Sequence, residues 1–179
     1  MNLYEKTLTS KYIYKGKILN LRFEEVELQN GETSSREIIE FPNSVSVIAT
    51  TENKKIVLVK QYRKPCESEL LEIVAGKMDK NEDPLECAKR ELSEETGYYS
   101  KKWKKIASFY TTPGYSNEFM NMYIAYDAIK GRAHPDEDEF LEIIEIDIKE
   151  LIEKVKNGEI KDAKTIMASF YLQTLYEQA

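Results

Sequence analysis

The strongest constraint on this chain is an acidic segment between two glycines, residues 76–98, which reads GKMDKNEDPLECAKRELSEETGY. Asp83 predicts the N-cap of a helix, with Pro84 at the first helical position and Glu86 completing a capping box. Gly97 predicts the end of this helix, because glycine readily adopts the left-handed conformation that closes many helices. The segment therefore predicts a loop, a helix and a second turn.

The predicted helix separates its charges from its apolar residues. Glu91, Glu94 and Glu95 are spaced i, i+3 and i+4, so their carboxylates share one face. The opposite face carries an apolar stripe that we expect to face the core: Leu85, Ala88 and Leu92. Carboxylates this close repel one another, and Mg²⁺ or Mn²⁺ would offset the repulsion because both ions favour oxygen ligands. The alternative is an ordinary solvated acidic face.

The spacing of these residues decides between the two interpretations. It matches the pattern G-x5-E-x7-R-E-U-x-E-E-x-G-U, in which U is a bulky apolar residue. The matching residues are Gly76, Glu82, Arg90, Glu91, Leu92, Glu94, Glu95, Gly97 and Tyr98. A chance match of the seven fixed residue types is expected on the order of once in 10⁸ starting positions. The pattern is the signature of the Nudix hydrolases, and the chain resembles that family, with Tyr98 a less usual residue at the last apolar position.

This resemblance implies a divalent metal site for Mg²⁺ or Mn²⁺. Its implied ligands are the backbone carbonyl of Ala75 and the carboxylates of Glu91, Glu95 and Glu139. Glu94 lies beside them in the catalytic group. Arg90 is expected to orient the glutamates through charge-assisted hydrogen bonds. Glu82 is expected to position the helix without binding metal.

A second acidic segment, residues 131–139, reads GRAHPDEDE. Relatives carry a similar loop that closes over the metals. By that resemblance Glu137 is the general base that activates water, since a carboxylate near a cation stays ionised at neutral pH. Glu139 is the further metal ligand. The alternatives are a solvated run of acids, or an exchange of roles with the neighbouring Asp136 and Asp138.

Several further residues resemble those that bind substrate in Nudix enzymes acting on ADP-ribose, whose signature is called the Nudix box. They are Arg36, Glu37, Arg63, Lys77, Thr112, Pro113, Gly114 and Glu118. Arg63, in a Gln-Tyr-Arg segment, would place its guanidinium fork on the substrate phosphates. The alternative for Arg63 is a solvated charge.

The spacing of Pro113, 16 residues after Gly97, resembles the family's marker for ADP-ribose. A Pro-Gly turn is also common for structural reasons alone. Glu118 resembles the acid that contacts the substrate ribose. Arg36 and Glu37 resemble a pair that lines the nucleobase side, and the alternative for them is an ion pair on a strand surface, which stabilises little.

Two domains are predicted, residues 1–42 and residues 43–179. The first reads as a small antiparallel sheet with strands at 3–8, 21–28 and 36–41 and a tight Asn30-Gly31 turn before the last. The resemblance implies that this sheet exchanges across a homodimer and contributes to the nucleobase pocket. For the second domain it implies the α/β class, as an α/β/α sandwich with a mixed sheet.

The remaining periodicity predicts the other elements of the second domain. Strands are expected at residues 44–51, 56–60, 70–74, 103–110, 119–127 and 140–146. Asp147 is expected to cap a helix over 149–157 that Gly158 ends. Asp162 is expected to cap a last helix over 163–177, with an apolar stripe formed by Ile166, Met167, Phe170 and Leu175.

Composition limits the partners. The net charge of −6 argues against nucleic acid, because there is no basic excess to release counterions. No apolar run approaches the length needed to span a bilayer. Cys66 and Cys87 lack metal-ligand spacing and suit a reduced cytoplasmic protein. The lone His134 is expected at the surface.

The sequence thus predicts an Mg²⁺-dependent enzyme that hydrolyses ADP-ribose to AMP and ribose 5-phosphate. One alternative is the same reaction on another nucleoside diphosphate sugar, such as GDP-mannose. A second is a non-catalytic Nudix module that binds nucleotides, although such modules usually lose the acids of the box. A Ca²⁺-binding protein is disfavoured because the EF-hand spacing is absent.

Overall fold

The computed structural model describes residues 3–132 and 140–177. The chain forms two compact units. The first comprises Met1–Ser44 and Ser108–Met120, and the second Val45–Ala107 and Asn121–Ala179. The segment 108–120 therefore belongs with the N-terminal residues, although the sequence places it more than 60 residues after them.

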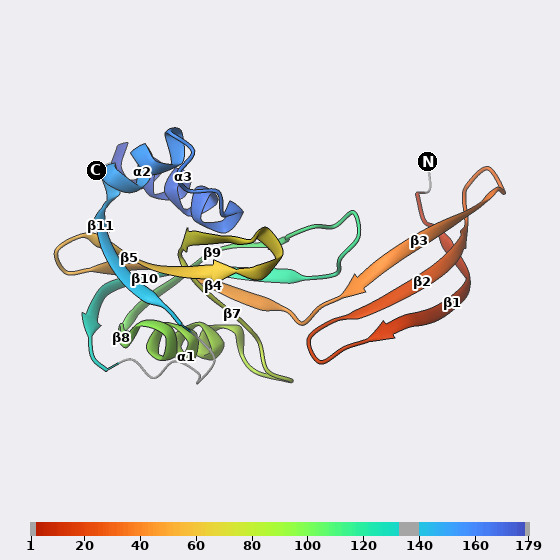
Figure 1. The fold of residues 1–179 in the computed structure, drawn as a ribbon, viewed down its shortest axis with the longest axis horizontal. Helices are drawn as coiled ribbons and strands as arrows, with labels where there is room; N and C mark the ends of the chain where they lie inside the picture. Colours follow the sequence, from red (N-terminus) through yellow and green to blue (C-terminus); the bar gives the residue numbers. More distant parts are fainter. Residues whose placement is uncertain (1–2, 133–139, 178–179) are drawn as a thin grey trace. The chain divides into compact units, whose positions relative to one another are not determined.

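The first unit contains a three-stranded antiparallel sheet in the order β1-β2-β3 (Figure 1). Its strands are β1 (Lys6–Lys15), β2 (Asn20–Glu27) and β3 (Thr33–Glu40). Gly31, with a φ of 81°, lies in the turn between β2 and β3 and donates its N–H to the carbonyl of Leu28 at 2.9 Å. The small N-terminal sheet and its Asn30-Gly31 turn are confirmed.

The bounds predicted for the first strand are wrong. The prediction was 3–8, whereas β1 covers Lys6–Lys15 and every residue in it is exposed. With no buried face, β1 shows no alternation that could mark its ends in the sequence. Threonine, tyrosine and isoleucine favour the extended conformation, and β2 supplies the pairing. Gly16, whose N–H donates to the carbonyl of Leu19 at 2.9 Å, forms the turn that follows.

The second unit is built on an eight-stranded mixed sheet. Five strands follow the order β11-β5-β4-β10-β8, while β6, β7 and β9 pair with β5, β4 and β10. The strands are β4 (Ser44–Thr51), β5 (Lys55–Arg63), β6 (Ser68–Glu72), β7 (Val74–Lys77), β8 (Tyr98–Tyr99), β9 (Lys102–Tyr110), β10 (Phe119–Lys130) and β11 (Glu142–Asp147). A short 3₁₀ turn, η1 (Lys64–Cys66), follows β5.

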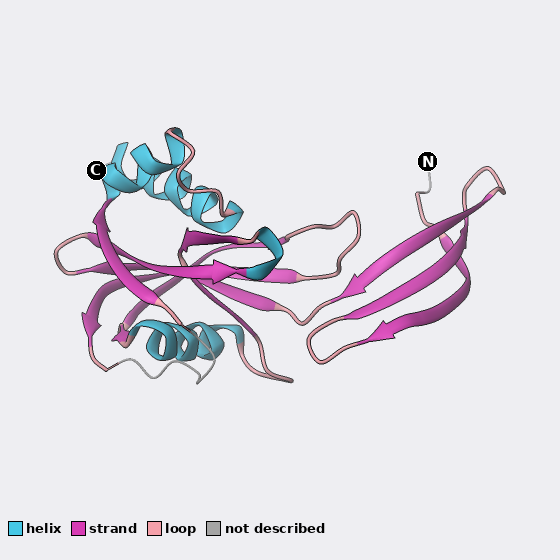
Figure 2. Ribbon diagram, viewed as in Figure 1, coloured by secondary structure: helices cyan, strands magenta, loops and turns pink. Residues whose placement is uncertain are grey.

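Helices cover both faces of this sheet. They are α1 (Pro84–Thr96), α2 (Ile148–Lys156) and α3 (Ala163–Glu177). Figure 2 shows α1 on one face and α2 with α3 on the other, which is the predicted α/β/α sandwich. None of the helices in the described ranges is long and apolar enough to cross a bilayer.

The core on the α1 side confirms the predicted stripe of that helix. Ala88 and Leu92 are fully buried against valines of the central strands, and Leu85 packs at the edge of the same cluster. The strand β4 is buried over most of its length, and β5 is buried over residues 56–59. At about 25 cal/mol per Å² of apolar surface, this burial is the main force that holds α1 on the sheet.

Both ends of α1 lie where the sequence predicts them. The Asp83 carboxylate accepts hydrogen bonds from the N–H groups of Leu85 at 2.9 Å and Glu86 at 3.2 Å. Gly97 closes the helix with a φ of 72°. The carboxylate of Glu86, expected to reach back as a capping box, instead accepts from Lys89 Nζ at 2.7 Å.

The start of α2 differs from the prediction. Asp147 occupies the N-cap position, but its side chain makes no capping hydrogen bond. Its carboxylate pairs with Lys55 Nζ at 2.8 Å. The two residues lie directly opposite each other on β11 and β5, so the cross-strand ion pair competes with the cap and prevails.

The predicted apolar stripe of α3 is wrong. Met167 is 39% exposed and Phe170 60% exposed. The buried face is instead formed by Thr165, Ala168, Ser169 and Leu172. A buried hydroxyl needs a hydrogen-bond partner, and Thr165 Oγ1 has one in the N–H of Ile73 at 2.8 Å. The helix itself carries apolar residues around its whole circumference, so hydrophobicity alone does not identify its buried face.

A buried polar cluster joins the start of α3 to the end of β6. Asp162 caps the helix as predicted, accepting from the N–H of Thr165 at 2.9 Å. Lys164 Nζ donates to Asp162 at 2.9 Å and also to Glu72. Glu72 is only 1% exposed, so this acid lies in the interior at the end of a strand.

The Glu72 carboxylate is predicted to make stability depend on pH. Burial raises the pKa of Glu72, but its hydrogen bonds and charge pairing with Arg63 and Lys164 outweigh burial, and the pKa lies below its ordinary value of 4.5. The ionised form therefore stabilises the fold above about pH 4.5, and this contribution is lost as pH falls through the lowered pKa.

Chemical denaturation of the wild type and of Glu72→Gln, from neutral pH to about pH 3, measures this contribution. The difference in unfolding free energy between the two should be largest at neutral pH and should shrink below about pH 4.5. A difference that stays constant with pH would contradict the assignment.

Candidate active site

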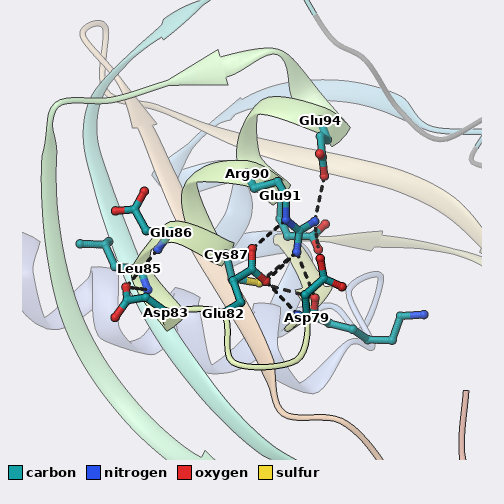
Figure 3. Close-up of polar contacts among 10 residues, drawn as sticks. Asp79, Glu82, Asp83, Leu85, Glu86, Cys87, Arg90, Glu91 and Glu94 are labelled. Carbon is teal, nitrogen blue, oxygen red and sulfur yellow. Dashed lines mark hydrogen bonds and ion pairs between the residues drawn. The ribbon is translucent and has the colours of Figure 1, made fainter.

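The guanidinium of Arg90 lies at the centre of the acidic helix face (Figure 3). Its Nε and Nη2 donate to the two carboxylate oxygens of Glu82 at 2.9 and 3.0 Å. Its Nη1 donates to Glu91 at 2.8 Å and to Glu94 at 2.9 Å. Arg90 thus contacts three glutamates of this face, as its predicted role in orienting them requires.

Arg90 also fixes the loop that precedes the helix. Its Nη2 donates to the backbone carbonyl of Lys77 at 3.2 Å. Glu82 accepts the N–H of Asp79 at 2.9 Å. The Arg90 hydrogen bonds, opposed by burial, lower the pKa of Glu82 to about 2, so this carboxylate is ionised throughout the physiological range. Glu82 therefore holds the loop and the helix together through one ion pair.

The thiol of Cys87 is part of the same contact region but is chemically inert. Its Sγ donates to the carbonyl of Lys77 at 3.5 Å and accepts from Arg90 Nη2 at 3.4 Å. Burial raises the pKa of Cys87 to about 12. A thiol with so high a pKa stays protonated at neutral pH and is neither a nucleophile nor a metal ligand.

Gly76 lies directly against the carboxylate of Glu91. A Cβ built on this glycine would be 1.9 Å from Cδ of Glu91 and 2.1 Å from its Oε1. Only a residue without a side chain leaves room for the carboxylate at this place. The end of β7, which contains Ala75 and Gly76, and the Glu91 carboxylate are thus side by side.

The charge balance of the helix face suits a cation. The four carboxylates of the box and its one guanidinium leave three negative charges among these five residues: Glu82, Arg90, Glu91, Glu94 and Glu95. Glu95 is only 5% exposed. Its negative charge also helps to raise the pKa of Arg63, after the larger effect of the Glu72 hydrogen bond, so Arg63 lies within electrostatic range of the box.

The donors present fit a hard divalent cation. No three His, Cys, Asp or Glu side chains in the described part of the chain gather into a cage for an ion. Mg²⁺ does not need such a cage, because it prefers one or two carboxylates together with water and substrate phosphates. Glu91 and Glu95, one helical turn apart beside the end of β7, supply carboxylate oxygens of this kind.

Part of the predicted site lies outside the described residues. The predicted base Glu137 and the predicted ligand Glu139 belong to this part, as do Asp136, Asp138 and His134. Their roles stay predictions.

In the first unit, the loop after β9 folds into a turn around Pro113 and Gly114. The carbonyl of Thr112 accepts from the N–H groups of Tyr115 at 3.1 Å and Ser116 at 2.9 Å. The turn is attached to β3, because the N–H of Ile39 donates to the carbonyl of Tyr115 at 2.7 Å. The predicted substrate-binding residues Thr112, Pro113 and Gly114 thus share one tight turn.

The carboxylate of Glu118 is held at both oxygens. Ser44 Oγ donates to one oxygen and Thr111 Oγ1 to the other, each at 2.7 Å. Its orientation is therefore set before any ligand binds.

The charged residues predicted on β3 do not pair with each other. Arg36 donates to Glu5 from Nε at 2.9 Å and from Nη2 at 2.5 Å. Its Nη1 donates to Ser34 Oγ and to the carbonyl of Ser35. Glu37 follows Arg36 directly on the strand, where successive side chains point to opposite faces.

Arg63 also has an acidic partner that the sequence did not indicate. Its Nε and Nη2 donate to Glu72 at 2.7 and 2.8 Å. The pairing was not predicted, but one signal could have indicated it. Glu72 is an acid within the apolar run LLEIV, and a buried carboxylate there needs a cation. The side chain of Lys77 is exposed, and its backbone carbonyl accepts a hydrogen bond from Arg90.

A separate hollow of about 290 Å³ lies on the other face of the sheet, and its lining includes Ile56, Ile124 and Leu172. It contains none of the predicted site residues. An apolar lining suits neither a diphosphate nor a metal ion, so the acidic face of α1 remains the better candidate.

Comparison with known families agrees with this geometry. The family described as NUDIX domain matches residues 40–169. A second family, described as Nucleoside diphosphate sugar hydrolase N-terminal domain, matches residues 5–39. Members of the Nudix family generally use divalent metal cations.

Individual relatives cover most of the chain. An ADP-ribose pyrophosphatase of Bacillus subtilis (strain 168) is 44% identical over 174 residues, which are 96% of this chain and 94% of the relative. A methanol dehydrogenase activator of Bacillus methanolicus is 45% identical over 171 residues, 94% of this chain and 92% of the relative. A GDP-mannose pyrophosphatase of Escherichia coli (strain K12) is 33% identical over 149 residues, 78% of each chain.

A solved structure shares the fold. The crystal structure of an ADP compounds hydrolase superposes with a TM-score of 0.88 at 20% identity, covering 99% of this chain and 97% of the other. The α/β/α sandwich with its small N-terminal sheet is therefore an established arrangement. Because the domain match extends over most of the sequence and the relatives align nearly end to end, this chain belongs to the Nudix hydrolase family.

Proposed function

We propose that this protein hydrolyses the diphosphate bond of ADP-ribose in the presence of Mg²⁺, releasing AMP and ribose 5-phosphate. The observation that carries the proposal is the intact acidic box, in which Arg90 holds Glu82, Glu91 and Glu94 while Gly76 leaves room for the Glu91 carboxylate. The substrate follows from the ADP-ribose pyrophosphatase relative, which aligns over 96% of the chain.

The residues proposed to hold the cation are Glu91, Glu95, Glu139 and the backbone carbonyl of Ala75. A bound Mg²⁺ or Mn²⁺ would offset the negative charge of the phosphates and lower the pKa of a bound water. Arg90 keeps the carboxylates oriented by its fork of hydrogen bonds, so the box is organised before the substrate enters.

The chain itself supplies the proton acceptor and the phosphate contact. Glu137 is proposed to take a proton from the attacking water. The water oxygen bonds to phosphorus as the bond to the bridging oxygen breaks, and the leaving phosphate takes up a proton. Arg63 is proposed to bind the phosphates, and Lys77 to contribute a further positive charge. Glu94 is proposed to be a catalytic residue that lies next to the metal ligands.

The first unit is proposed to recognise the rest of the substrate. Glu118 would accept a hydrogen bond from a ribose hydroxyl, because its carboxylate is already fixed by Ser44 and Thr111. Arg36 and Glu37 would contact the nucleobase. The turn that contains Thr112, Pro113 and Gly114 would bind the remaining part of the nucleotide sugar.

We also propose a homodimer in the cytoplasm. The homodimer follows from the resemblance to ADP-ribose hydrolases, in which the N-terminal sheet exchanges between subunits. Cys66 and Cys87 are both free thiols, which agrees with a reducing compartment.

Two alternatives have support from named relatives. A GDP-mannose pyrophosphatase shares 33% identity, so another nucleoside diphosphate sugar is the nearest competing substrate. A methanol dehydrogenase activator shares 45% identity, so a role exerted on a partner enzyme is the competing function class. The complete set of box acids favours catalysis over binding alone.

A panel of nucleoside diphosphate sugars tests the proposed substrate. We expect Mg²⁺-dependent turnover with the highest kcat/KM for ADP-ribose, and AMP with ribose 5-phosphate as products. Chelation of the cation should remove activity. Preference for GDP-mannose would replace the substrate, and absence of turnover with every diphosphate would favour the binding module.

The carboxylate of Glu91 should be essential for turnover. Glu91→Gln is expected to lower kcat roughly 10²-fold or more, because it removes a negative charge proposed to hold the cation that would offset the charge of the phosphates. Glu86→Gln is the matched control on the same helix, since the Glu86 carboxylate pairs with Lys89 at the surface. Similar losses in both variants would contradict a specific role for Glu91.

The close approach of Gly76 to Glu91 should make this glycine irreplaceable. Gly76→Ala would put a methyl group 1.9 Å from the carboxylate carbon, so Glu91 must move away. We expect a loss of about 10²-fold in kcat/KM, since a misplacement of about 1 Å has that effect. Circular dichroism should show an intact fold, and wild-type kcat/KM would disprove the packing argument.

A further inference from the structure

The side chain of Arg63 is held by Glu72, an acid that has no role in the proposed binding of substrate. Arg63 ends β5 and Glu72 ends β6, and the two strands are antiparallel neighbours. Nε and Nη2 of Arg63 donate to the two oxygens of Glu72 at 2.7 and 2.8 Å. Two parallel hydrogen bonds of this kind fix the plane of the guanidinium as well as its position.

Glu72 is in turn fixed by a second cation. Its side chain is 2% exposed, and Lys164 Nζ donates to the oxygen that also accepts from Arg63 Nη2. Lys164 is itself 11% exposed and donates to Asp162 at 2.9 Å. A buried carboxylate with two cationic partners remains ionised and has little freedom to rotate.

The geometry leaves one side of Arg63 available. A guanidinium carries five N–H donors, of which the hydrogen bonds to Glu72 use one on Nε and one on Nη2. The remaining donors are on Nη1 and on the far side of Nη2, which form the second fork of the group. The Arg63 side chain is 39% exposed while Glu72 is buried, so this second fork is on the more accessible side.

From these contacts we propose that Glu72 and Lys164 are positioning residues for Arg63: Glu72 holds the inner fork of the guanidinium so that the outer fork presents two N–H donors to a substrate phosphate, and Lys164 holds Glu72. The proposal rests on the proposed function, because it takes Arg63 to be a phosphate ligand.

The same contacts attach the site to α3. Asp162 caps that helix, and Thr165 accepts the N–H of Ile73, the residue after Glu72. The chain then continues through Val74 and Ala75 to Gly76. The start of α3 therefore fixes both the partner of Arg63 and the strand end that lies against Glu91.

Stability alone does not account for this arrangement. Replacing a buried ion pair by apolar residues of similar volume is often neutral or stabilising. A carboxylate shared by two cations costs desolvation of three charges, while an apolar contact between β6 and α3 would avoid that cost. The ionic cluster instead gives Arg63 a defined orientation, which is what recognition of a phosphate needs.

The test compares Glu72→Gln, Arg63→Met and two double variants, Glu72→Gln/Lys164→Met and Arg63→Met/Glu72→Gln, with the wild type. Binding of the non-hydrolysable α,β-methylene analogue of ADP-ribose is measured by calorimetry with Mg²⁺, beside kcat/KM for ADP-ribose and the melting temperature. Glu69→Gln is the matched control, because it removes the ion pair with Lys60 between the same two strands at the surface.

We expect Glu72→Gln to weaken analogue binding about tenfold and to lower kcat/KM on the order of 10²-fold. The double variant removes the excess positive charge, so its melting temperature should recover while its affinity remains low. Once Arg63 is methionine, adding Glu72→Gln should produce no further loss of affinity, because the two residues act as one unit. Glu69→Gln should match the wild type in all three measurements.

Three results would overturn the positioning role. They are wild-type affinity in Glu72→Gln, recovery of affinity together with stability in the double variant, and equal affinity losses from Glu72→Gln with and without Arg63. If the wild type hydrolyses no diphosphate, the proposed function fails, and the affinity comparison still decides the positioning role on its own.

Discussion

Repulsion among the box carboxylates is the constraint on which the site depends. Glu91, Glu94 and Glu95 lie on one helix face, and two unit charges about 4 Å apart interact by several kcal/mol near a protein surface. Arg90 offsets part of this repulsion and orients the acids, but the four carboxylates and one guanidinium of the box still leave three negative charges. The fold therefore keeps an excess of negative charge on this helix face, and a divalent cation would reduce it.

The fold maintains this excess of negative charge because helices on both faces of the sheet hold the residues of the site. On one face, α1 is held by buried apolar contacts and carries the acids. On the other, the start of α3 holds the Glu72–Ile73 end of β6 through Lys164 and Thr165. The strand end between them is fixed from both directions. Stability of the sandwich and geometry of the site are thus produced by the same contacts.

Local signals in the sequence predicted the elements whose ends depend on nearby residues. The caps of α1, the Asn30-Gly31 turn and the Leu85, Ala88 and Leu92 stripe are examples. The buried face of α3 was not predictable from hydrophobicity, because Thr165 and Ser169 are buried with their hydrogen bonds satisfied. Arg36 and Arg63 pair with acids that lie on other strands or segments of the chain. Spacing along the sequence therefore did not predict these ion pairs.

Selection between nucleotide sugars would come from residues outside the box, because the proposed role of the box acids is at the diphosphate. In the first unit Glu118 is held at both oxygens, so its acceptors have fixed directions. Arg36, by contrast, donates to Glu5 through the same fork that would read a base edge. A site that hydrogen-bonds its substrate strongly rejects an analogue that leaves those groups unpaired. The proposed recognition of ribose by Glu118 would therefore use a preorganised carboxylate, whereas the proposed recognition of the base by Arg36 would require the Glu5 contact to be shared or exchanged.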